Sequence, residues 1–207
     1  MQTRLWLISH ASTAAQRSAT FADANEPLDA RGLAEANAFA QRPRFAFGGV
    51  DEVRVLTSPA ACARDTARAL GFDAAVATEL ADTDYGEWQR MRVADIATQA
   101  PQALEAWLRD PAAAPPRGES FEAVLARVGA WLDALAGNDR SGRTVVAITH
   151  AAVLRAALIH VLHAPPAAFT QIEIAPLTTI GLRSSKRGWT WWPHAPGESA
   201  PIPQTTA

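Results

Sequence analysis

Two histidines stand at the ends of two apolar segments that lie far apart in the chain. His10 follows the apolar run 5–8, and His150 follows the run 145–148. Unbroken apolar runs of this length are typical of strands buried on both faces of a parallel sheet. Ligands of open α/β sheets bind at the carboxyl ends of the strands, so two imidazoles there predict phosphoryl or proton transfer.

The surrounding sequence alternates expected strands with expected helices. Strands are expected at 4–8, 53–57, 74–78, 144–148, 170–175, 178–184 and 188–192. Helices are expected at 30–41, 59–70, 91–98, 101–109, 119–136 and 151–162, and residues 11–28 read as a long loop. This alternation favours a three-layer α/β/α domain with a mostly parallel central sheet.

The domain organisation follows from the same pattern. We expect one domain over residues 1–192, followed by a proline-rich tail at 193–207. Within the domain, residues 80–118 form an inserted segment that should lie over the carboxyl edge of the sheet. A length of 207 residues fits a single domain of this kind.

Composition limits the classes of partner and the compartment. The chain is 48% hydrophobic and 19% charged, with a formal net charge of −2, and it has no basic stripe. We therefore expect a small-molecule ligand, no nucleic acid and no membrane, and the chain leaves a monomer or a dimer open. The single cysteine, Cys62, excludes an internal disulfide and suits a reducing compartment, so the cytoplasm is expected.

Metals and cofactors are not expected either. The chain has five histidines and one cysteine, and they show no spacing typical of a zinc site. The spacing from Cys62 to Arg68 formally fits a cysteine-dependent phosphatase. That chemistry needs a glycine-containing loop around the phosphate, whereas Cys62 falls inside an expected helix without glycines.

Five segments resemble, in order and spacing, the motifs of the histidine phosphatase (phosphoglycerate mutase-like) superfamily: residues 7–13, 58–67, 82–88, 118–120 and 149–153. The first reads Leu-Ile-Ser-His-Ala-Ser-Thr where the family has Arg-His-Gly-x-Thr. The last reads Thr-His-Ala-Ala-Val where the family has His-Gly-Gly-Val. The resemblance covers about residues 4–183 and implies a phosphoglycerate mutase-like fold.

The resemblance also implies a mechanism. His10 would attack the phosphorus atom as a neutral imidazole and form a phosphohistidine. His150 would donate a hydrogen bond, or a charge, to the phosphoryl oxygens. Asp82 occupies the position of the acid that protonates the leaving oxygen, and for that role its pKa must be raised.

Two departures concern the phosphate clamp. The family has arginines where this chain has Ser9 and Cys62, and one lost donor of this kind typically costs roughly 3–4 kcal/mol of transition-state stabilisation. Arg17, in the loop after His10, is a candidate replacement. Arg64 is a second candidate, although two residues turn a helix by about 200° and so direct it away from the Cys62 side. The expected substrate-binding residues are Ser9, Arg17, Ser58, Cys62, Arg64, Glu119 and Ser120.

Two functions remain open at this point. The first is a phosphomonoester hydrolase that acts through a phosphohistidine with altered or reduced activity. The second is a catalytically silent relative that binds a phosphorylated or acidic ligand, or a protein partner. The missing arginines favour the second function, whereas the retained His10, His150 and Asp82 favour the first.

Overall fold

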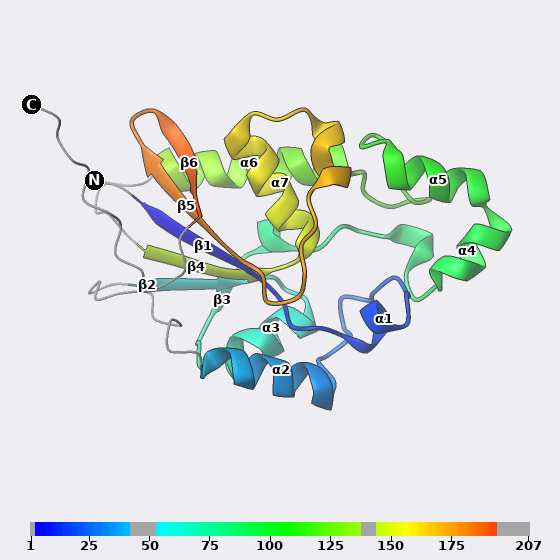
Figure 1. Ribbon diagram of the computed structural model, residues 1–207, viewed down its shortest axis with the longest axis horizontal. Helices are drawn as coiled ribbons and strands as arrows, with labels where there is room; N and C mark the ends of the chain where they lie inside the picture. The colour runs from blue at the N-terminus through cyan, green and yellow to red at the C-terminus, as the bar shows by residue number, and fades with distance from the viewer. Residues whose placement is uncertain (1–2, 42–52, 138–143, 194–207) are drawn as a thin grey trace, which may run out of the picture.

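The computed structural model describes residues 3–41, 53–137 and 144–193, and these form a sheet between two layers of helices (Figure 1). The sheet has six strands in the order β3-β2-β4-β1-β5-β6. The first four strands run parallel, and β5 and β6 run antiparallel to their neighbours. The expected three-layer architecture with a mostly parallel sheet is confirmed.

The strands are β1 (Arg4–Ser9), β2 (Val53–Thr57), β3 (Ala75–Val76), β4 (Thr144–Thr149), β5 (Thr179–Ser185) and β6 (Gly188–Trp192). The α-helices are α1 (Ala14–Arg17), α2 (Ala30–Ala40), α3 (Ala61–Ala69), α4 (Val93–Gln99), α5 (Pro101–Arg109), α6 (Phe121–Gly137) and α7 (Ala151–Leu162). The described residues also form the 3-10 helices η1 (Thr78–Leu80), η2 (Gly86–Trp88) and η3 (Pro166–Gln171).

The register of the two central strands brings the two histidines together. Strands β1 and β4 pair in parallel with Ser9 opposite Thr149. The amide of His10 then donates to the carbonyl of Thr149 at 2.8 Å. Each histidine is the next residue after its strand, so His10 and His150 leave the sheet side by side at its carboxyl edge.

Both faces of β1 and β4 are buried, which explains their unbroken apolar sequences. One face packs against α6 and α7, and it carries Leu5, Leu7, Val145 and Ala147. The other packs against α2 and α3, and it carries Trp6, Ile8, Val146 and Ile148. Burying a leucine or isoleucine side chain contributes about 1.5–3 kcal/mol, so this layered core holds the edge of the sheet in a fixed geometry.

The segment 80–118 forms a lobe with its own small core. Trp88, Ile96 and Leu104 are buried there against Phe21, which comes from the segment after His10. Two glycines permit the chain to cross itself at the base of this lobe, because a Cβ on Gly86 would lie 2.2 Å from the Pro116 carbonyl oxygen and one on Gly118 2.5 Å from that of Asp84. The lobe is thereby fixed beside the carboxyl ends of β1 and β4 (Figure 1).

Some expected elements differ in the structure. Residues 11–28 are not entirely a loop, because they include α1. A reciprocal capping box of Thr13 and Gln16 caps the N-terminus of this helix. Residues 170–175 are not a strand, since η3 runs to Gln171. Helix α3 begins two residues later than the expected 59–70, because Ala60 is its N-cap. The expected tail falls almost entirely on residues 194–207, which lie outside the described residues. Within the described segments, no helix is long and apolar enough to span a membrane.

Candidate active site

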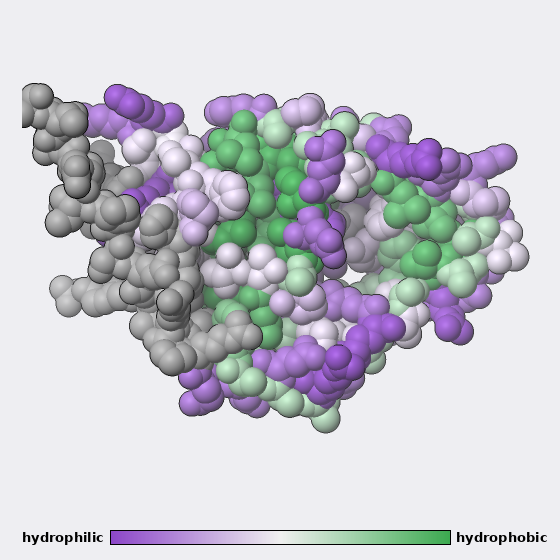
Figure 2. Space-filling model, in the orientation of Figure 1, coloured by the Kyte–Doolittle hydropathy of each residue, from purple (hydrophilic) through white to green (hydrophobic). Residues whose placement is uncertain are grey.

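A cavity lies where the carboxyl edge of the sheet faces the lobe. It consists of two adjoining hollows of about 520 Å³ and about 600 Å³, and His10, Asp82 and His150 line both. Tyr85 and Trp107 of the lobe line both as well. Figure 2 shows this side of the molecule hollowed between the body of the domain and the lobe. The two expected imidazoles and the expected carboxyl group therefore share one cavity.

The His10 side chain is fixed in one tautomer. The residue is 6% exposed, and its Nδ1 lies 2.7 Å from the carbonyl oxygen of Ala11. Because a carbonyl only accepts hydrogen bonds, Nδ1 carries the hydrogen and Nε2 keeps its lone pair. The rings of His10 and His150 meet edge to face with centroids 5.0 Å apart. His10 thus offers a nucleophilic nitrogen beside a second imidazole.

His150 lies between a hydroxyl group and a carboxyl group. Its Nε2 lies 2.8 Å from Oγ of Ser58, and its Nδ1 lies 3.4 Å from Oδ2 of Asp82. The Ser58 Oγ also accepts the amide hydrogen of Ala60, so this hydroxyl group links His150 to the start of α3. Ser58 therefore orients His150 and shapes the start of α3 without being its N-cap.

Burial sets the ionisation of these groups. It lowers the pKa of His10 from 6.5 to about 4, with the neighbouring His150 adding to the effect. Burial also lowers the pKa of His150 to about 3, with a smaller contribution from the Arg127 charge. The pKa of Asp82 is raised, because burial outweighs the His10 charge that opposes it. Neutral imidazoles beside a carboxyl group with a raised pKa favour the protonation states that a nucleophile and a general acid need.

Arg155 lines the cavity, although the sequence did not predict an arginine from this helix at the site. Arg155, on α7, is the only arginine or lysine among the described residues that line the two hollows. Its Nε donates to the carbonyl of Ile172 at 2.7 Å. Burial lowers its pKa, while Tyr85, Asp82 and Glu173 oppose this effect, so its charge acts on the cavity. Arg155 lies five residues after His150. Residues three or four apart lie on the same side of a helix, so a spacing of five does not clearly predict that Arg155 is near the site.

Glu119 acts on the site through Arg127. The carboxylate of Glu119 holds Arg127 at two nitrogens, with distances of 2.9 Å and 3.2 Å. Arg127 in turn donates to the carbonyls of Glu79 at 2.6 Å and Ala81 at 3.1 Å. This pair therefore fixes the backbone that leads into Asp82. Glu119 and Ser120 line a neighbouring depression together with Asp82 and do not line the hollows around His10.

The other expected substrate contacts lie elsewhere. Ser9 donates to the carbonyl of Ala175 at 2.7 Å and is occupied with the segment before β5. Arg17 pairs with Asp29 and donates to Ser12, so the structure directs it away from the cavity. Arg64 is exposed on α3 and lines neither hollow. The loop from 11 to 28 folds onto α2 and the lobe, a conformation that its sequence does not determine.

Cys62 lies at the cavity with both histidines. Its thiol is buried, and burial raises its pKa to about 12, so it is protonated at neutral pH. Such a thiol is a poor nucleophile, and its place in α3 confirms that no phosphate loop surrounds it. Arg68, the other residue of that spacing, pairs with Asp65 on the exposed side of α3. One ligand atom of Cys62 and one of each histidine lie within 4.8 Å of one another.

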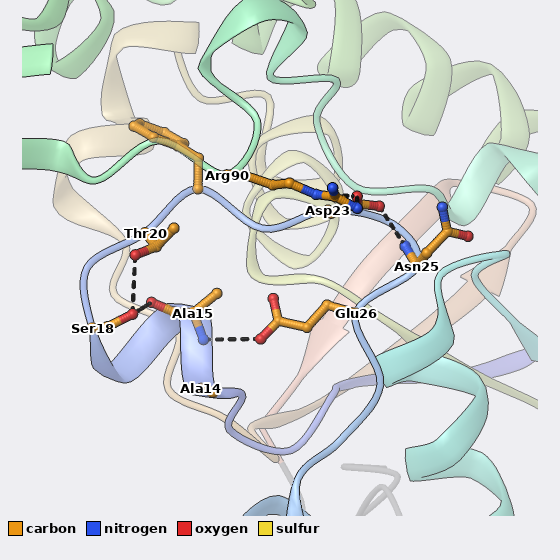
Figure 3. A pocket seen from close by; sticks show the side chains of 9 residues that line it. Ala14, Ala15, Ser18, Thr20, Asp23, Asn25, Glu26 and Arg90 are labelled. Atoms are coloured by element: carbon orange, nitrogen blue, oxygen red, sulfur yellow. Dashed lines mark hydrogen bonds and ion pairs between the residues drawn. The ribbon is translucent and has the colours of Figure 1, made fainter. Parts of the chain in front are cut away.

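A separate depression lies beside α1 (Figure 3). It is lined by Glu26 and by Asp23, which pairs with Arg90, and neither His10 nor His150 reaches it. Glu26 accepts the amide hydrogen of Ala15 at 3.0 Å, so its carboxylate supports α1. We therefore place the site at the cavity that holds the two histidines.

Fold and site together define a class of protein. Two imidazoles at the carboxyl ends of adjacent parallel strands, with a buried carboxyl group beside them, form a two-histidine centre in a three-layer α/β/α domain. A model of the histidine phosphatase superfamily, branch 1, matches residues 5–192, and the chain belongs to this superfamily.

Individual relatives and structures agree with this assignment. A bifunctional protein of Mycobacterium tuberculosis is 33% identical over 162 residues, which cover 72% of this chain and 41% of that protein. The chain thus spans less than half the length of this curated relative. A mycobacterial glucosyl-3-phosphoglycerate phosphatase, solved in complex with VO3, is 26% identical with a TM-score of 0.78, covering 95% of this chain and 99% of that one.

The fold also matches more distant structures. The alpha-ribazole phosphatase of Shigella flexneri has a TM-score of 0.78 at 22% identity, covering 94% of this chain and 96% of that one. At this level of identity the match concerns the fold alone.

Proposed function

We propose that this protein hydrolyses a small phosphomonoester through a phosphohistidine on His10. One observation carries the proposal. The Nδ1–H of His10 is held by the Ala11 carbonyl, so Nε2 keeps its lone pair in a cavity that also holds His150 and Asp82. A neutral, oriented imidazole beside a protonated carboxyl group is the arrangement that phosphoryl transfer to nitrogen requires.

The reaction balances in two steps. The Nε2 lone pair of His10 forms a bond to phosphorus while the bond to the ester oxygen breaks, and Asp82 gives its proton to that oxygen. In the second step a water molecule attacks the phosphohistidine, and the Asp82 carboxylate takes a proton from the water. Inorganic phosphate leaves, and His10 and Asp82 return to their initial states.

The groups that stabilise the phosphoryl oxygens differ from the two arginines that the superfamily has at positions 9 and 62. Ser9 turns away from the cavity, and Cys62 is a neutral thiol. We assign the cationic role to Arg155 and a hydrogen-bonding role to His150. One arginine in place of two supports a turnover lower than that of relatives with the full clamp.

Hydrolysis of p-nitrophenyl phosphate tests this proposal. The His10→Ala variant should lose at least about 10³-fold in kcat/KM, because it removes the nucleophile. His163→Asn is the matched control. His163 is exposed at the end of α7 in a left-handed conformation that asparagine tolerates.

A second outcome favours the alternative function. Equal background rates for the wild type and His10→Ala, with phosphate or an acidic ligand still bound, would identify a catalytically silent binding protein. The arrangement of Ser9 and Cys62 is the observation that keeps this alternative in view.

A further inference from the structure

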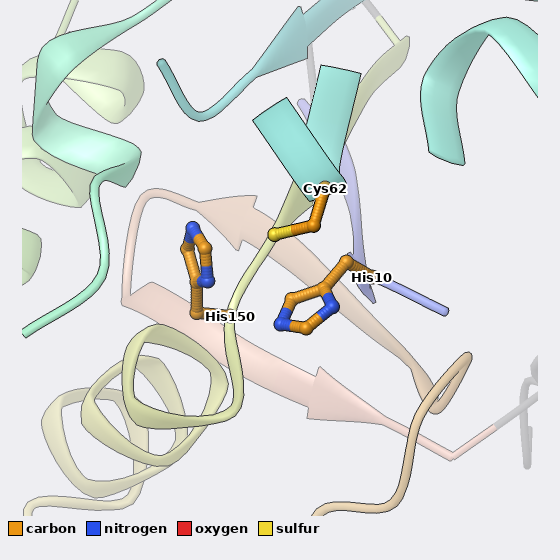
Figure 4. Close-up of side chains that lie close together, drawn as sticks. All are labelled: His10, Cys62 and His150. Carbon is orange, nitrogen blue, oxygen red and sulfur yellow. The ribbon is translucent and has the colours of Figure 1, made fainter. Parts of the chain in front are cut away.

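Three potential metal ligands meet in the cavity. His10, Cys62 and His150 each offer one atom, and these atoms lie within 4.8 Å of one another. Figure 4 shows the sulfur of Cys62 and a ring nitrogen of His10 pointing toward the ring of His150. The three come from the ends of β1 and β4 and from the start of α3, so no local spacing in the sequence reveals them.

The orientation of His10 suits a metal ligand. Histidines that bind metals usually donate their second ring N–H to a carbonyl or a carboxylate, which fixes the ring and the tautomer. The Nδ1 of His10 makes such a bond to Ala11 O at 2.7 Å, which leaves Nε2 free to bind. The carbonyl is itself rigid, because Ala11 is fully buried and its amide donates to Thr66 Oγ1.

His150 offers a nitrogen that the protein does not satisfy. Within the part of the chain that the structure describes, its Nδ1 is buried and has no hydrogen-bond partner. The residue is 3% exposed. A buried, unsatisfied polar atom is destabilising unless a partner is supplied. A metal ion in the cavity is one such partner.

The donor set selects the class of metal. Two imidazoles and one thiolate form a borderline-soft set that suits Zn²⁺ and excludes Mg²⁺ and Ca²⁺, which take oxygen ligands. Zinc bonds of about 2.0–2.1 Å to nitrogen and 2.3 Å to sulfur place tetrahedral ligands roughly 3.3–3.6 Å apart. Because the three ligand atoms lie within 4.8 Å of one another, the side chains need to close by at most about 1.5 Å.

We propose that His10, Cys62 and His150 bind one Zn²⁺ ion, and that this ion and phosphoryl transfer exclude each other. Zinc binding displaces the proton of the Cys62 thiol and forms a zinc–sulfur bond. The same ion takes the Nε2 lone pair of His10. Three protein ligands leave a fourth position for water or for an oxygen of a bound anion. The binding of zinc goes beyond the proposed function. The mutual exclusion of zinc and phosphoryl transfer rests on the proposed function.

Cobalt titration tests the binding without any turnover. Co²⁺ substitutes for Zn²⁺, and a thiolate ligand gives it a near-ultraviolet charge-transfer band. We expect this band in the wild type, its displacement by Zn²⁺, and its loss in Cys62→Ala and Cys62→Ser. His10→Ala and His150→Ala should weaken Zn²⁺ binding at least about tenfold. Retained thermal unfolding midpoints show that these variants fold.

Two control variants separate this site from adventitious binding. His163→Asn changes an exposed histidine, and His194→Gln changes one outside the described residues. Both should bind Co²⁺ and Zn²⁺ as the wild type does. A wild type that gives no charge-transfer band, or that binds Zn²⁺ no more tightly than Cys62→Ala, would overturn the proposal.

Turnover assays then test the exclusion. Stoichiometric Zn²⁺ should inhibit hydrolysis of p-nitrophenyl phosphate by the wild type, and Cys62→Ala should need at least about tenfold more Zn²⁺ for the same inhibition. Metal binding without any His10-dependent turnover contradicts the proposed function alone. His10-dependent turnover without metal binding contradicts the zinc site alone.

Discussion

The Nδ1 atom of His150 lies 3.4 Å from Oδ2 of Asp82, and burial moves the pKa values of these two groups in opposite directions. Burial disfavours the charged form of each, so the imidazole is neutral near neutral pH and the carboxyl group keeps its proton to a higher pH than a free aspartic acid does. The cavity can therefore store the proton that a leaving oxygen needs. This relationship leads to a prediction about pH.

The pH profile of kcat/KM should be bell-shaped, with both limbs displaced from the positions that the ordinary pKa values of histidine and aspartate would give. His10 stays unprotonated down to a pKa of about 4, so activity should fall only in that acidic region. The raised pKa of Asp82 should extend activity above the usual carboxyl range before the alkaline limb begins. Steady-state rates across this pH range, measured with a non-activated alkyl phosphate, check both limbs.

Asp82→Asn should remove the alkaline limb. The rate on an alkyl phosphate should fall at least about 10²-fold, because the poor leaving group needs the proton. The kcat/KM on p-nitrophenyl phosphate should fall far less, because it reports the phosphorylation of His10 and this leaving group needs no proton. Asp95→Asn, on the exposed surface of the same lobe, is the control. Equal losses on both substrates would argue against Asp82 as the acid.

Arg155→Met should weaken substrate binding. Charge-assisted hydrogen bonds contribute about 1.5–3 kcal/mol, so KM should rise roughly tenfold to a hundredfold. Arg155→Lys keeps the charge and should lie between Met and the wild type. Arg68→Met removes an exposed charge on α3 and should leave KM unchanged. An unchanged KM in Arg155→Met would contradict the assignment of Arg155 as the cation that binds the phosphate.

Arg127→Met should act through the position of Asp82. Its loss frees the carbonyls of Glu79 and Ala81, so kcat should fall roughly tenfold while KM changes little. The alkaline limb should also move, because Arg127 acts on the Asp82 carboxyl. Arg109→Met removes an exposed ion pair on α5 and should change neither quantity. A drop in thermal stability with wild-type kcat would indicate a structural role only.

Stability should fall on the acidic side of neutrality. His150 has a pKa of 6.5 when unfolded and about 3 when folded, so below pH 6.5 the unfolded state binds more protons. The linked stability is complete above pH 6.5 and is lost progressively as the pH falls toward 3. Between pH 7 and pH 5 the loss is about 2 kcal/mol for this group. Urea unfolding at both values measures it, and His150→Gln should reduce the difference.

The sequence predicts the centre of this site well and its periphery poorly. The apolar runs of β1 and β4 fix their burial on both faces, and the parallel pairing then brings His10 and His150 together. The resemblance to the superfamily supplied Asp82, which lies in a lobe whose path depends on many contacts. These features follow from local pattern or from family order.

The positions of the cations could not be predicted in the same way. Arg17 is turned toward Asp29 because α1 forms within an expected loop. Arg155 reaches the cavity because α7 leads away from His150 and Ile172, the residue after η3, supplies a carbonyl to its Nε. The Cys62 sulfur joins the histidines only through tertiary structure. Each of these depends on packing between segments distant in the chain.

Trapping a phosphoryl-enzyme by rapid quench tests the central claim most directly. The enzyme is mixed with a radiolabelled phosphomonoester and quenched in alkali, which preserves phosphohistidine. We predict label on wild type and on His163→Asn, lost on mild acid treatment and located on the peptide that contains His10. His10→Ala should carry no label. Acid-stable label, or label that persists in His10→Ala, would contradict the assignment of His10 as the nucleophile.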